Sequence, residues 1–269
     1  MDDFRILVDE MKVRGFSRKT IKCYLHINSR FLEFIKKSPK DINKSDIEAY
    51  LVHLYDRNLS SATRHLACAA LKFYYEEVMK RRFQLKFPKK SSKLPIVLEK
   101  EEILKMIDAT SNLKHKLLLM LMYGSGLRVG EAIKARIEDF DIHIKVFTVK
   151  SGKGAKDRYT NLSEKFIHNF TIFTKNKLSG FLFESEYNIG HPITSRTASK
   201  IVEHSLRKAG ISKKAHCHTL RTSYATHLIE NGTDISYIQK LLGHSDIRTT
   251  QSYIRLSNES IRNVKSPLD

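Results

Sequence analysis

Apolar residues recur every three or four positions through the first part of the chain, as they do along one face of a helix. Phe4, Leu7, Val8 and Met11 begin this pattern, and Gly15 predicts the end of the helix that carries them. The spacing then resumes and continues without any strand-like alternation. This part of the chain is therefore expected to be entirely helical.

Short polar side chains predict where the following helices begin. Ser17 is a candidate N-cap for a second helix, and the run Ser45-Asp46-Ile47-Glu48 has the pattern of a capping box that opens a third. Ser60 or Ser61 predicts the start of a fourth helix. Residues 1–83 are thus predicted to form a four-helix domain.

Composition changes after this domain. Residues 84–97 contain two prolines and two serines, which disfavour regular structure, together with several lysines and no acidic side chain. We interpret this stretch as an interdomain linker, either simply solvated or lying against phosphate. The side chains expected to contact DNA phosphate are Lys86, Lys89, Lys90 and Lys93.

A second domain is predicted over residues 98–269. It begins with helical patterns at 99–110 and 113–123, the second apolar enough to be buried. Alternation over Ile142–Val149, a turn-rich segment and a short strand at Tyr159–Leu162 then predict a β-hairpin with Lys153 at or near its tip. Further helices are expected at about 163–176, 195–209, 217–231, 234–242 and 246–254. The expected fold class is mainly α, with a small β-sheet or hairpin in the C-terminal domain.

Charge narrows the class of partner. The 269 residues include 48 Lys and Arg against 29 Asp and Glu, which gives a formal net charge of +19. Because 41% of the residues are hydrophobic, the chain can build a core and is not a disordered polycation. The basic excess extends over both predicted domains, so a polyanion such as nucleic acid is favoured over a small neutral ligand or a membrane surface.

The cysteine pattern and the lack of signal-peptide or membrane-spanning patterns predict a reducing, cytoplasmic environment. Cys23, Cys68 and Cys217 form no CxxC pair, so a disulfide framework is not expected and a reducing environment fits. The N-terminus lacks the pattern of a signal peptide, and apolar runs such as Leu117–Tyr123 are far shorter than the roughly 20 residues that span a bilayer. We expect a cytoplasmic protein without membrane segments.

Candidate chemistry begins at the segment Gly124-Ser125-Gly126-Leu127-Arg128-Val129-Gly130-Glu131. Its glycines allow a sharp turn before a helix, with Arg128 at the helix start and Glu131 one turn later. A cation at that end opposes the helix dipole and needs an anion, which Glu131 supplies in part while it orients the guanidinium toward a phosphate. A plain surface Arg–Glu pair is the alternative. Lys153, between two glycines, is a candidate of the same kind, although a lysine in a turn is usually inert.

His218 and Arg221 lie three residues apart on one predicted helix, so they project from the same face and offer two donors to one phosphate. The run His216-Cys217-His218 raises the alternative of a metal site. Consecutive residues do not converge readily on one ion, and no second pair of ligands has zinc-like spacing, so no metal is expected.

Two further candidates, His244 and Tyr253, stand close together near the end of the chain. Most tyrosines are half-buried core residues, and the chain contains 11 of them. A phenol with a pKa of about 10 is protonated at neutral pH, so a nucleophilic tyrosine needs nearby cations or a base.

In their order and context these residues resemble the tyrosine recombinase family, also called the phage integrase family. The runs Gly-Ser-Gly-Leu-Arg-x-x-Glu, Gly-Lys-Gly-x-Lys-x-Arg and Leu-Gly-His-Ser-x-x-x-Thr-Thr-x-x-Tyr are jointly specific. The resemblance covers the whole chain, because residues 1–83 look like the family's helical core-binding domain. The short length is most similar to Xer recombinases, particularly the archaeal type. One departure is Thr222, where Xer proteins usually carry a histidine, and it leaves the local packing open.

The resemblance implies a two-domain clamp around duplex DNA that performs site-specific strand exchange without cofactor, metal or ATP. The family's working unit is a tetramer on DNA, with monomers expected in free solution. Arg128 and Arg221 would neutralise the nonbridging oxygens and His244 would add a hydrogen bond. His218 would accept the phenol proton or help to bind phosphate. Tyr253 would form a 3′-phosphotyrosyl link, and Lys153 would protonate the leaving 5′ oxygen.

Several functions share these features. Resolution of chromosome or plasmid dimers is the expected role, and integration of a mobile element is the alternative within the family. A DNA-binding protein that keeps the fold without the chemistry is a third possibility, but such a protein should lose one or more of the six catalytic residues, and all six are present. A type IB topoisomerase shares the catalytic constellation, yet the core-binding pattern of residues 1–83 argues against it.

Overall fold

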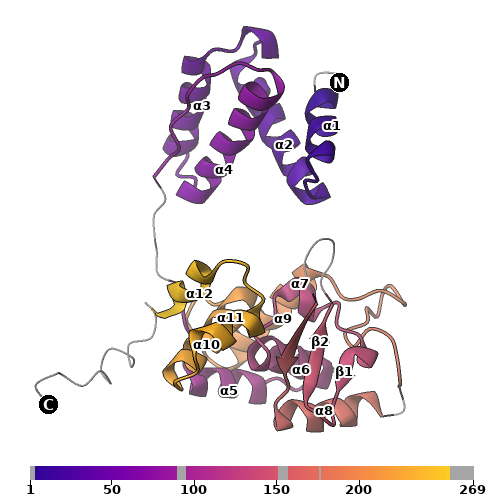
Figure 1. Cartoon of the computed structure of the whole chain (residues 1–269). Helices are drawn as coiled ribbons and strands as arrows, with labels where there is room; N and C mark the ends of the chain where they lie inside the picture. Colours follow the sequence, from indigo (N-terminus) through magenta and orange to yellow (C-terminus); the bar gives the residue numbers. More distant parts are fainter. Residues whose placement is uncertain (1–3, 90–94, 151–156, 176, 255–269) are drawn as a thin grey trace, which may run out of the picture. The chain divides into compact units, whose positions relative to one another are not determined.

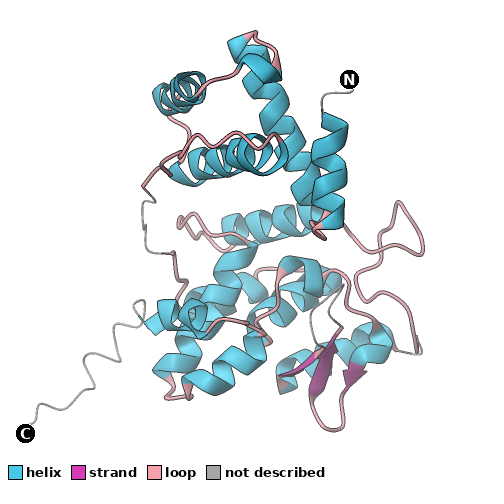
Figure 2. Ribbon diagram, turned by 45° about the horizontal axis from the view of Figure 1, so that its top comes forward, coloured by secondary structure: helices cyan, strands magenta, loops and turns pink. Residues whose placement is uncertain are grey.

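The computed structural model describes residues 4–89, 95–150, 157–175 and 177–254. The chain divides into two compact units, Met1–Lys93 and Leu94–Asp269, and each has its own hydrophobic core. The predicted fold class is confirmed, because helices dominate both units and a few short strands lie together in the second (Figures 1 and 2). Among the described helices, none combines the length and apolar character needed to cross a membrane.

The first unit contains the four predicted helices, with a short 3₁₀ turn before the third and a π-helical turn after the fourth (Figure 1). These elements are α1 (Arg5–Val13), α2 (Arg18–Ile35), η2 (Pro39–Asp41), α3 (Lys44–Asp56), α4 (Ser61–Lys72) and η3 (Phe73–Val78). As predicted, Ser17 and Ser60 cap α2 and α4 by accepting hydrogen bonds from backbone amides.

The predicted start of α3 is corrected by two residues. Asn43, not Ser45, is the N-cap, because its side chain accepts the amide of Asp46 at 3.0 Å. The Asp46 carboxylate in turn accepts the amide of Asn43 at 2.9 Å, which completes the capping box. The Ser45 hydroxyl instead donates a hydrogen bond to the Asn43 side-chain oxygen at 2.6 Å. Ser45 therefore stabilises the N-cap residue but is not itself the N-cap.

The start of the predicted linker packs against the first unit. Leu85 is only 6% exposed and belongs to this unit's hydrophobic core. The Phe87 ring lies 4.6 Å from the His65 ring, and the Lys72 ammonium lies over its face at 5.5 Å. Lys86 and Lys89 are exposed, whereas Lys90 and Lys93 lie outside the described residues.

The second unit joins helices to a three-stranded antiparallel sheet in the order β1-β2-β3. Its first elements are α5 (Lys100–Asp108), α6 (Leu113–Gly124), α7 (Val129–Ala132), η4 (Ile137–Asp139), β1 (Phe140–Asp141), β2 (Val146–Val149) and β3 (Arg158–Asn161). The remaining elements, all predicted to within two residues, are α8 (Glu164–Thr174), α9 (Ser195–Lys208), α10 (Cys217–Glu230), α11 (Ile235–Leu242) and α12 (Ile247–Ile254).

The predicted strand at Ile142–Val149 is wrong in its first half. Residues 142–145 form a turn, because the Asp141 carboxylate accepts the amides of His143 and Ile144 at 3.0 and 3.1 Å and reverses the chain. The strand begins only at Val146, and β1 was not predicted at all. The segment 151–156, which includes Lys153 and the predicted hairpin tip, lies outside the described residues.

Two buried helices organise the second unit's core. All six residues from Leu117 to Met122 of α6 are buried, as predicted for this apolar helix. Helix α10 packs against α6 and α12, and it buries polar residues together with apolar ones. The buried polar side chains of α10 are Thr219, Arg221, Thr222, Ser223 and Thr226. Arg221 is the one charged residue among these buried side chains, and the partners of its guanidinium form the site described next.

Candidate active site

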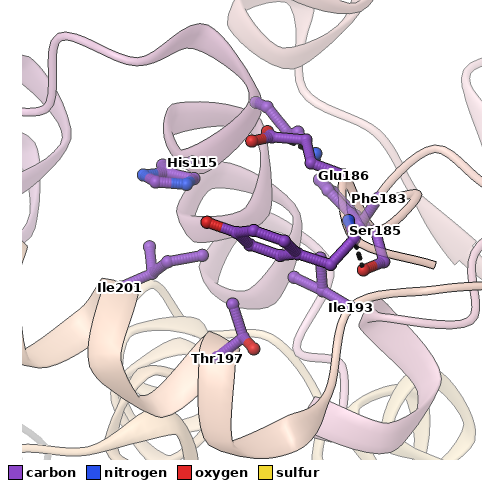
Figure 3. Close-up of a pocket in the computed structure, with 9 residues that line it drawn as sticks. His115, Phe183, Ser185, Glu186, Ile193, Thr197 and Ile201 are labelled. Atoms are coloured by element: carbon purple, nitrogen blue, oxygen red, sulfur yellow. Dashed lines mark hydrogen bonds and ion pairs between the residues drawn. The ribbon is translucent and has the colours of Figure 1, made fainter.

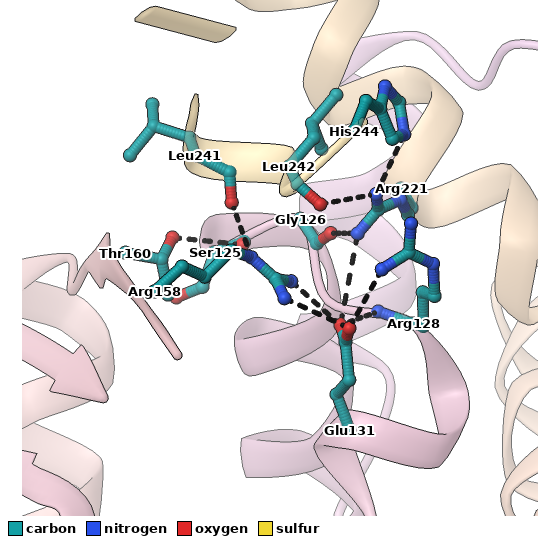
Figure 4. Close-up of polar contacts among 10 residues, drawn as sticks. All are labelled: Ser125, Gly126, Arg128, Glu131, Arg158, Thr160, Arg221, Leu241, Leu242 and His244. Carbon is teal, nitrogen blue, oxygen red and sulfur yellow. Dashed lines mark hydrogen bonds and ion pairs between the residues drawn. The ribbon is translucent and has the colours of Figure 1, made fainter. Parts of the chain in front are cut away.

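Five of the six residues predicted to be catalytic lie among the described residues, and they come from separate parts of the second unit. Arg128 is the N-cap of α7, His218 and Arg221 lie on α10, His244 follows α11, and Tyr253 lies on α12. Contacts join Arg128, Arg221, His244 and Tyr253 into one network, part of which is shown in Figure 4. The sixth residue, Lys153, lies outside the described part of the chain.

Glu131 holds Arg128 at the start of α7, as the sequence predicted. Its carboxylate accepts the Arg128 amide at 2.8 Å and the Arg128 Nη1 at 2.9 Å. The Arg128 side chain is still 49% exposed, whereas the Glu131 side chain is 16% exposed. Glu131 therefore holds the guanidinium through Nη1, while the side chain as a whole stays half exposed and the other N–H groups remain able to donate to a ligand.

A second arginine, Arg158, donates hydrogen bonds to the same carboxylate. The sequence did not predict it as a site residue. Its Nη1 and Nη2 donate to the two Glu131 oxygens at 3.0 and 2.8 Å, and its Nε donates to the carbonyl of Leu241 at 2.9 Å. Its side chain is 10% exposed. The one signal in the sequence was its place at the end of the run Gly-Lys-Gly-x-Lys-x-Arg, and no local spacing links it to Glu131, which lies 27 residues earlier.

Arg221 is the most deeply placed of these cations. It is 1% exposed, and its Nη1 and Nη2 donate to the carbonyls of Gly126 and Leu242, each at 2.7 Å (Figure 4). Its Nη1 lies 3.8 Å from a Glu131 oxygen. Burial and the nearby charge of Arg128 lower the pKa of Arg221 to about 10, so the group stays charged at neutral pH.

Three guanidinium groups thus surround one carboxylate. Burial alone would raise the pKa of Glu131, but hydrogen bonds from Arg158 and from the Arg128 amide outweigh burial and lower the pKa to about 2. The carboxylate is therefore charged at every physiological pH. Even so, it balances only one of the three cations, so the site carries an excess of positive charge that an anion would relieve.

His244 is hydrogen-bonded through both of its ring nitrogens. Nε2 lies 2.9 Å from Arg221 Nη2, and Nδ1 lies 2.9 Å from the Thr250 hydroxyl. A guanidinium has only donors, so Nε2 accepts and the proton of the neutral ring sits on Nδ1. Burial, with the charges of Arg221, Arg128 and Arg158, lowers the pKa of His244 to about 4, which agrees with a neutral ring.

His218 and Tyr253 are the remaining predicted residues that the structure describes. His218 is exposed one turn before Arg221, and its pKa is lowered by partial desolvation and by the charge of Arg221, which favours a neutral ring able to accept a proton. Tyr253 is only 4% exposed, and its ring stacks on His244 with centroids 6.1 Å apart. The phenol is therefore next to the cations but covered by protein.

Two glycines let the backbone approach these side chains closely. Gly126 has a φ of +60°, and an added Cβ would stand 2.4 Å from the ring of Tyr224. Gly243 has a φ of +64°, and its Cβ would stand 2.7 Å from Arg158 Cδ. Both positions combine a left-handed backbone with a neighbour that fills the Cβ position, so any other residue would displace the site.

A pocket of about 200 Å³ elsewhere in the second unit contains none of these residues. It is lined by α6, α9 and the segment between α8 and α9, with Phe183, Ile193 and Ile201 among its apolar residues (Figure 3). Lys114 and Glu186, which also line this pocket, form an ion pair at 3.2 Å. Among the side chains that the structure describes, no group of three or more His, Cys, Asp or Glu could hold a metal ion.

Comparison with known proteins places both parts of the chain in one family. Residues 97–260 match the phage integrase family, and residues 4–85 match the phage integrase N-terminal SAM-like domain. A Sinorhizobium fredii protein named as an integrase/recombinase is 33% identical over 97% of this chain and 86% of its own length. The tyrosine recombinase XerA of Pyrococcus horikoshii is 33% identical over 94% of this chain and 88% of its own. The crystal structure of the XerH site-specific recombinase bound to its difH substrate, a pre-cleavage complex, has a TM-score of 0.71 at 25% identity and covers 91% of this chain and 80% of that one.

The packing around Gly126 gives a first prediction. Gly126→Ala should lower the free energy of unfolding of the second unit by about 2–4 kcal/mol, since the new methyl group meets Tyr224 and the backbone is left-handed. Gly130→Ala is the matched control, because nothing lies within 4 Å of its Cβ position and alanine favours a helix. Urea unfolding followed by circular dichroism measures both. Equal stability of the two variants would contradict the close approach of Tyr224.

The low pKa of Glu131 gives a second prediction. Its folded-state pKa of about 2 lies below the ordinary 4.5, so the charged carboxylate stabilises the fold above about pH 4.5 and loses that effect as the pH falls toward 2. Between about pH 6 and pH 3 the wild type should lose on the order of 2 kcal/mol more than Glu131→Gln, which has no carboxylate to protonate. Urea unfolding at several pH values tests this. Parallel pH curves for the two proteins would show that the guanidinium groups do not hold the carboxylate.

Proposed function

Since the chain belongs to the phage integrase family and is a tyrosine recombinase, we propose that the cluster around Glu131 binds the DNA phosphate at which strands are exchanged. The observation that supports this most is the surplus of positive charge, three guanidinium groups around one carboxylate. A phosphodiester carries the negative charge that this surplus lacks. Each guanidinium can donate two hydrogen bonds in one plane, a geometry that suits phosphate oxygens.

In this proposal the chain's own side chains carry every step of cleavage. Arg128, Arg221 and His244 hold the nonbridging oxygens and stabilise the charge that grows on them. The Tyr253 oxygen attacks phosphorus and forms a 3′-phosphotyrosyl bond, while its proton passes to His218 or to solvent. The bond to the 5′ oxygen breaks, and Lys153 supplies the proton that makes it a 5′-hydroxyl. The reverse attack by a new 5′-hydroxyl rejoins the strand without ATP or metal.

Duplex DNA is the proposed partner of both units. The net charge of +19 favours a polyanion, and the XerH neighbour is bound to its difH substrate. We assign residues 1–83 to a core-binding domain, residues 84–97 to the linker and residues 98–269 to the catalytic domain. Lys86, Lys89, Lys90 and Lys93 would contact phosphate from the linker. Strand exchange would take place in a tetramer on two DNA sites in the cytoplasm.

An Xer-like role in resolving chromosome or plasmid dimers is the cellular function that we propose. Its support is the XerA relative, which aligns with most of both chains. Integration of a mobile element is the second candidate, and the integrase/recombinase name of the Sinorhizobium fredii relative favours it. The sites that the protein attacks in a genome distinguish the two roles.

The test of the function is to trap the covalent complex on DNA from the source organism. Protein stopped with detergent during cleavage should remain attached to 3′ ends, and sequencing these ends should recover a small set of sites. Tyr253→Phe should give no attachment, and Tyr187→Phe, which removes a fully exposed phenol, should match the wild type. Attachment by Tyr253→Phe would contradict the assigned nucleophile, and attachment without site preference would contradict site-specific exchange.

Lys153 gives a prediction about the leaving group. A 5′ alkoxide is strongly basic and needs a proton donor, whereas a sulfur in that bridging position leaves as a thiolate and hardly needs one. Lys153→Ala should therefore cleave ordinary DNA poorly but cleave a 5′-bridging phosphorothiolate nearly as well as the wild type. Arg221→Ala should remain impaired on both substrates, because sulfur does not replace the lost charge on the nonbridging oxygens. If Lys153→Ala is equally slow on the sulfur substrate, Lys153 positions DNA and is not the general acid.

A further inference from the structure

Thr250 links the imidazole of His244 to the helix that carries Tyr253. It is fully buried in α12, and its hydroxyl lies 2.9 Å from His244 Nδ1. Thr250 and Tyr253 stand three residues apart, so they share one face of α12, and the Tyr253 ring stacks on the same imidazole. One buried hydroxyl thus connects His244, the proposed hydrogen-bond donor to the phosphate, with the helix of Tyr253, the proposed nucleophile.

The hydrogen bond between Arg221 and His244 shows what must change when phosphate binds. The two hydrogens of Arg221 Nη2 are directed to the Leu242 carbonyl and to His244 Nε2. For His244 to donate to a phosphate oxygen instead, Nε2 must carry a proton. In a neutral ring that means one proton leaves Nδ1 and one is gained at Nε2, with no change of charge. Nδ1 then turns from a donor into an acceptor.

A hydroxyl is the side-chain group that suits Nδ1 in both states. It accepts a hydrogen bond when Nδ1 is protonated, and by rotating about its C–O bond it donates one when Nδ1 is not. A carbonyl in the same place could only accept and would hold the ring in one form. Thr250 therefore keeps the ring oriented while the proton changes position.

We propose that Thr250 is a positioning residue, which holds the His244 ring in the orientation for phosphate in both tautomers and fixes it relative to Tyr253. This inference rests on the proposed function, in which His244 donates to the phosphate. The charged or titratable groups around the ring are Arg221 and His218 of α10, Arg128 before α7, Arg158 of β3 and Tyr253 of α12. Thr250 itself is uncharged and supplies orientation only.

Three threonine variants test the hydroxyl directly. Thr250→Val keeps the shape but removes the hydroxyl, and Thr250→Ser keeps the hydroxyl. Thr226→Val is the matched control, because Thr226 is also buried in the second unit and its hydroxyl has no hydrogen-bond partner. The assay is single-turnover cleavage of a duplex built on a site recovered by covalent trapping, with DNA affinity measured in parallel.

The expected loss is confined to Thr250→Val. Its cleavage rate should fall by about tenfold or more, the size of loss found when the partner that orients a metal-bound imidazole is removed. Thr250→Ser should recover most of the rate, Thr226→Val should match the wild type, and DNA affinity should change little because Thr250 has no exposed surface. Wild-type cleavage by Thr250→Val, or equal loss in Thr250→Ser, would overturn the proposal.

Nitrogen NMR of histidine-labelled protein tests the proton shift without any threonine variant. The free protein should carry the His244 proton on Nδ1, and the DNA complex of Tyr253→Phe, which cannot cleave, should carry one on Nε2. The same proton position in both samples would overturn the inference. His244→Ala distinguishes the proposed role of His244 from the proposed role of Thr250. If it cleaves at the wild-type rate, the proposed function of His244 fails, but if it is slow while Thr250→Val is fast, only the role of Thr250 fails.

Discussion

A single, largely buried carboxylate holds the cations of this site in place. Glu131 accepts hydrogen bonds from Arg128 and Arg158 and lies within ion-pair distance of Arg221. These three arginines come from the start of α7, from β3 and from α10, so one side chain connects three elements that are distant in the sequence. Without this carboxylate the three like charges would have no counter-charge among these partners, only backbone carbonyls, and Coulomb repulsion in a partly buried place would favour their separation.

Backbone carbonyls at the end of α11 also hold two of the arginines. Leu241 and Leu242 are the last residues of α11, and their carbonyls accept hydrogen bonds from Arg158 and Arg221. Carbonyls at the end of a helix have no partner within the helix and carry its partial negative charge, so they stabilise cations. Gly243 then ends α11 in a left-handed conformation and leads directly into His244. The end of one short helix therefore both fixes two arginines and delivers the histidine.

The sequence was sufficient for the features that depend on local spacing. Most helices of the second unit lie within two residues of their predicted bounds, and the pairing of Arg128 with Glu131 follows from their separation by one helical turn. The sequence-based prediction failed where one local pattern fits two structures. At residues 142–145 the alternation typical of a strand falls on a turn that the Asp141 side chain stabilises. The sequence also could not reveal Arg158 or Thr250 as members of the site. Their contacts depend on how β3 and α12 pack against α7 and His244, and no residue spacing encodes that packing.

The burial of Tyr253 has a consequence for the cell as well as for the reaction. Tyr253 is only 4% exposed, so in this packing its hydroxyl is shielded from a phosphate that merely passes over the surface. A protein with a net charge of +19 meets many phosphates for every target site. With Tyr253 as the proposed nucleophile, a phenol that was always exposed would risk a broken strand at each brief encounter. On that proposal, the packing of one aromatic ring would keep such encounters from nicking DNA.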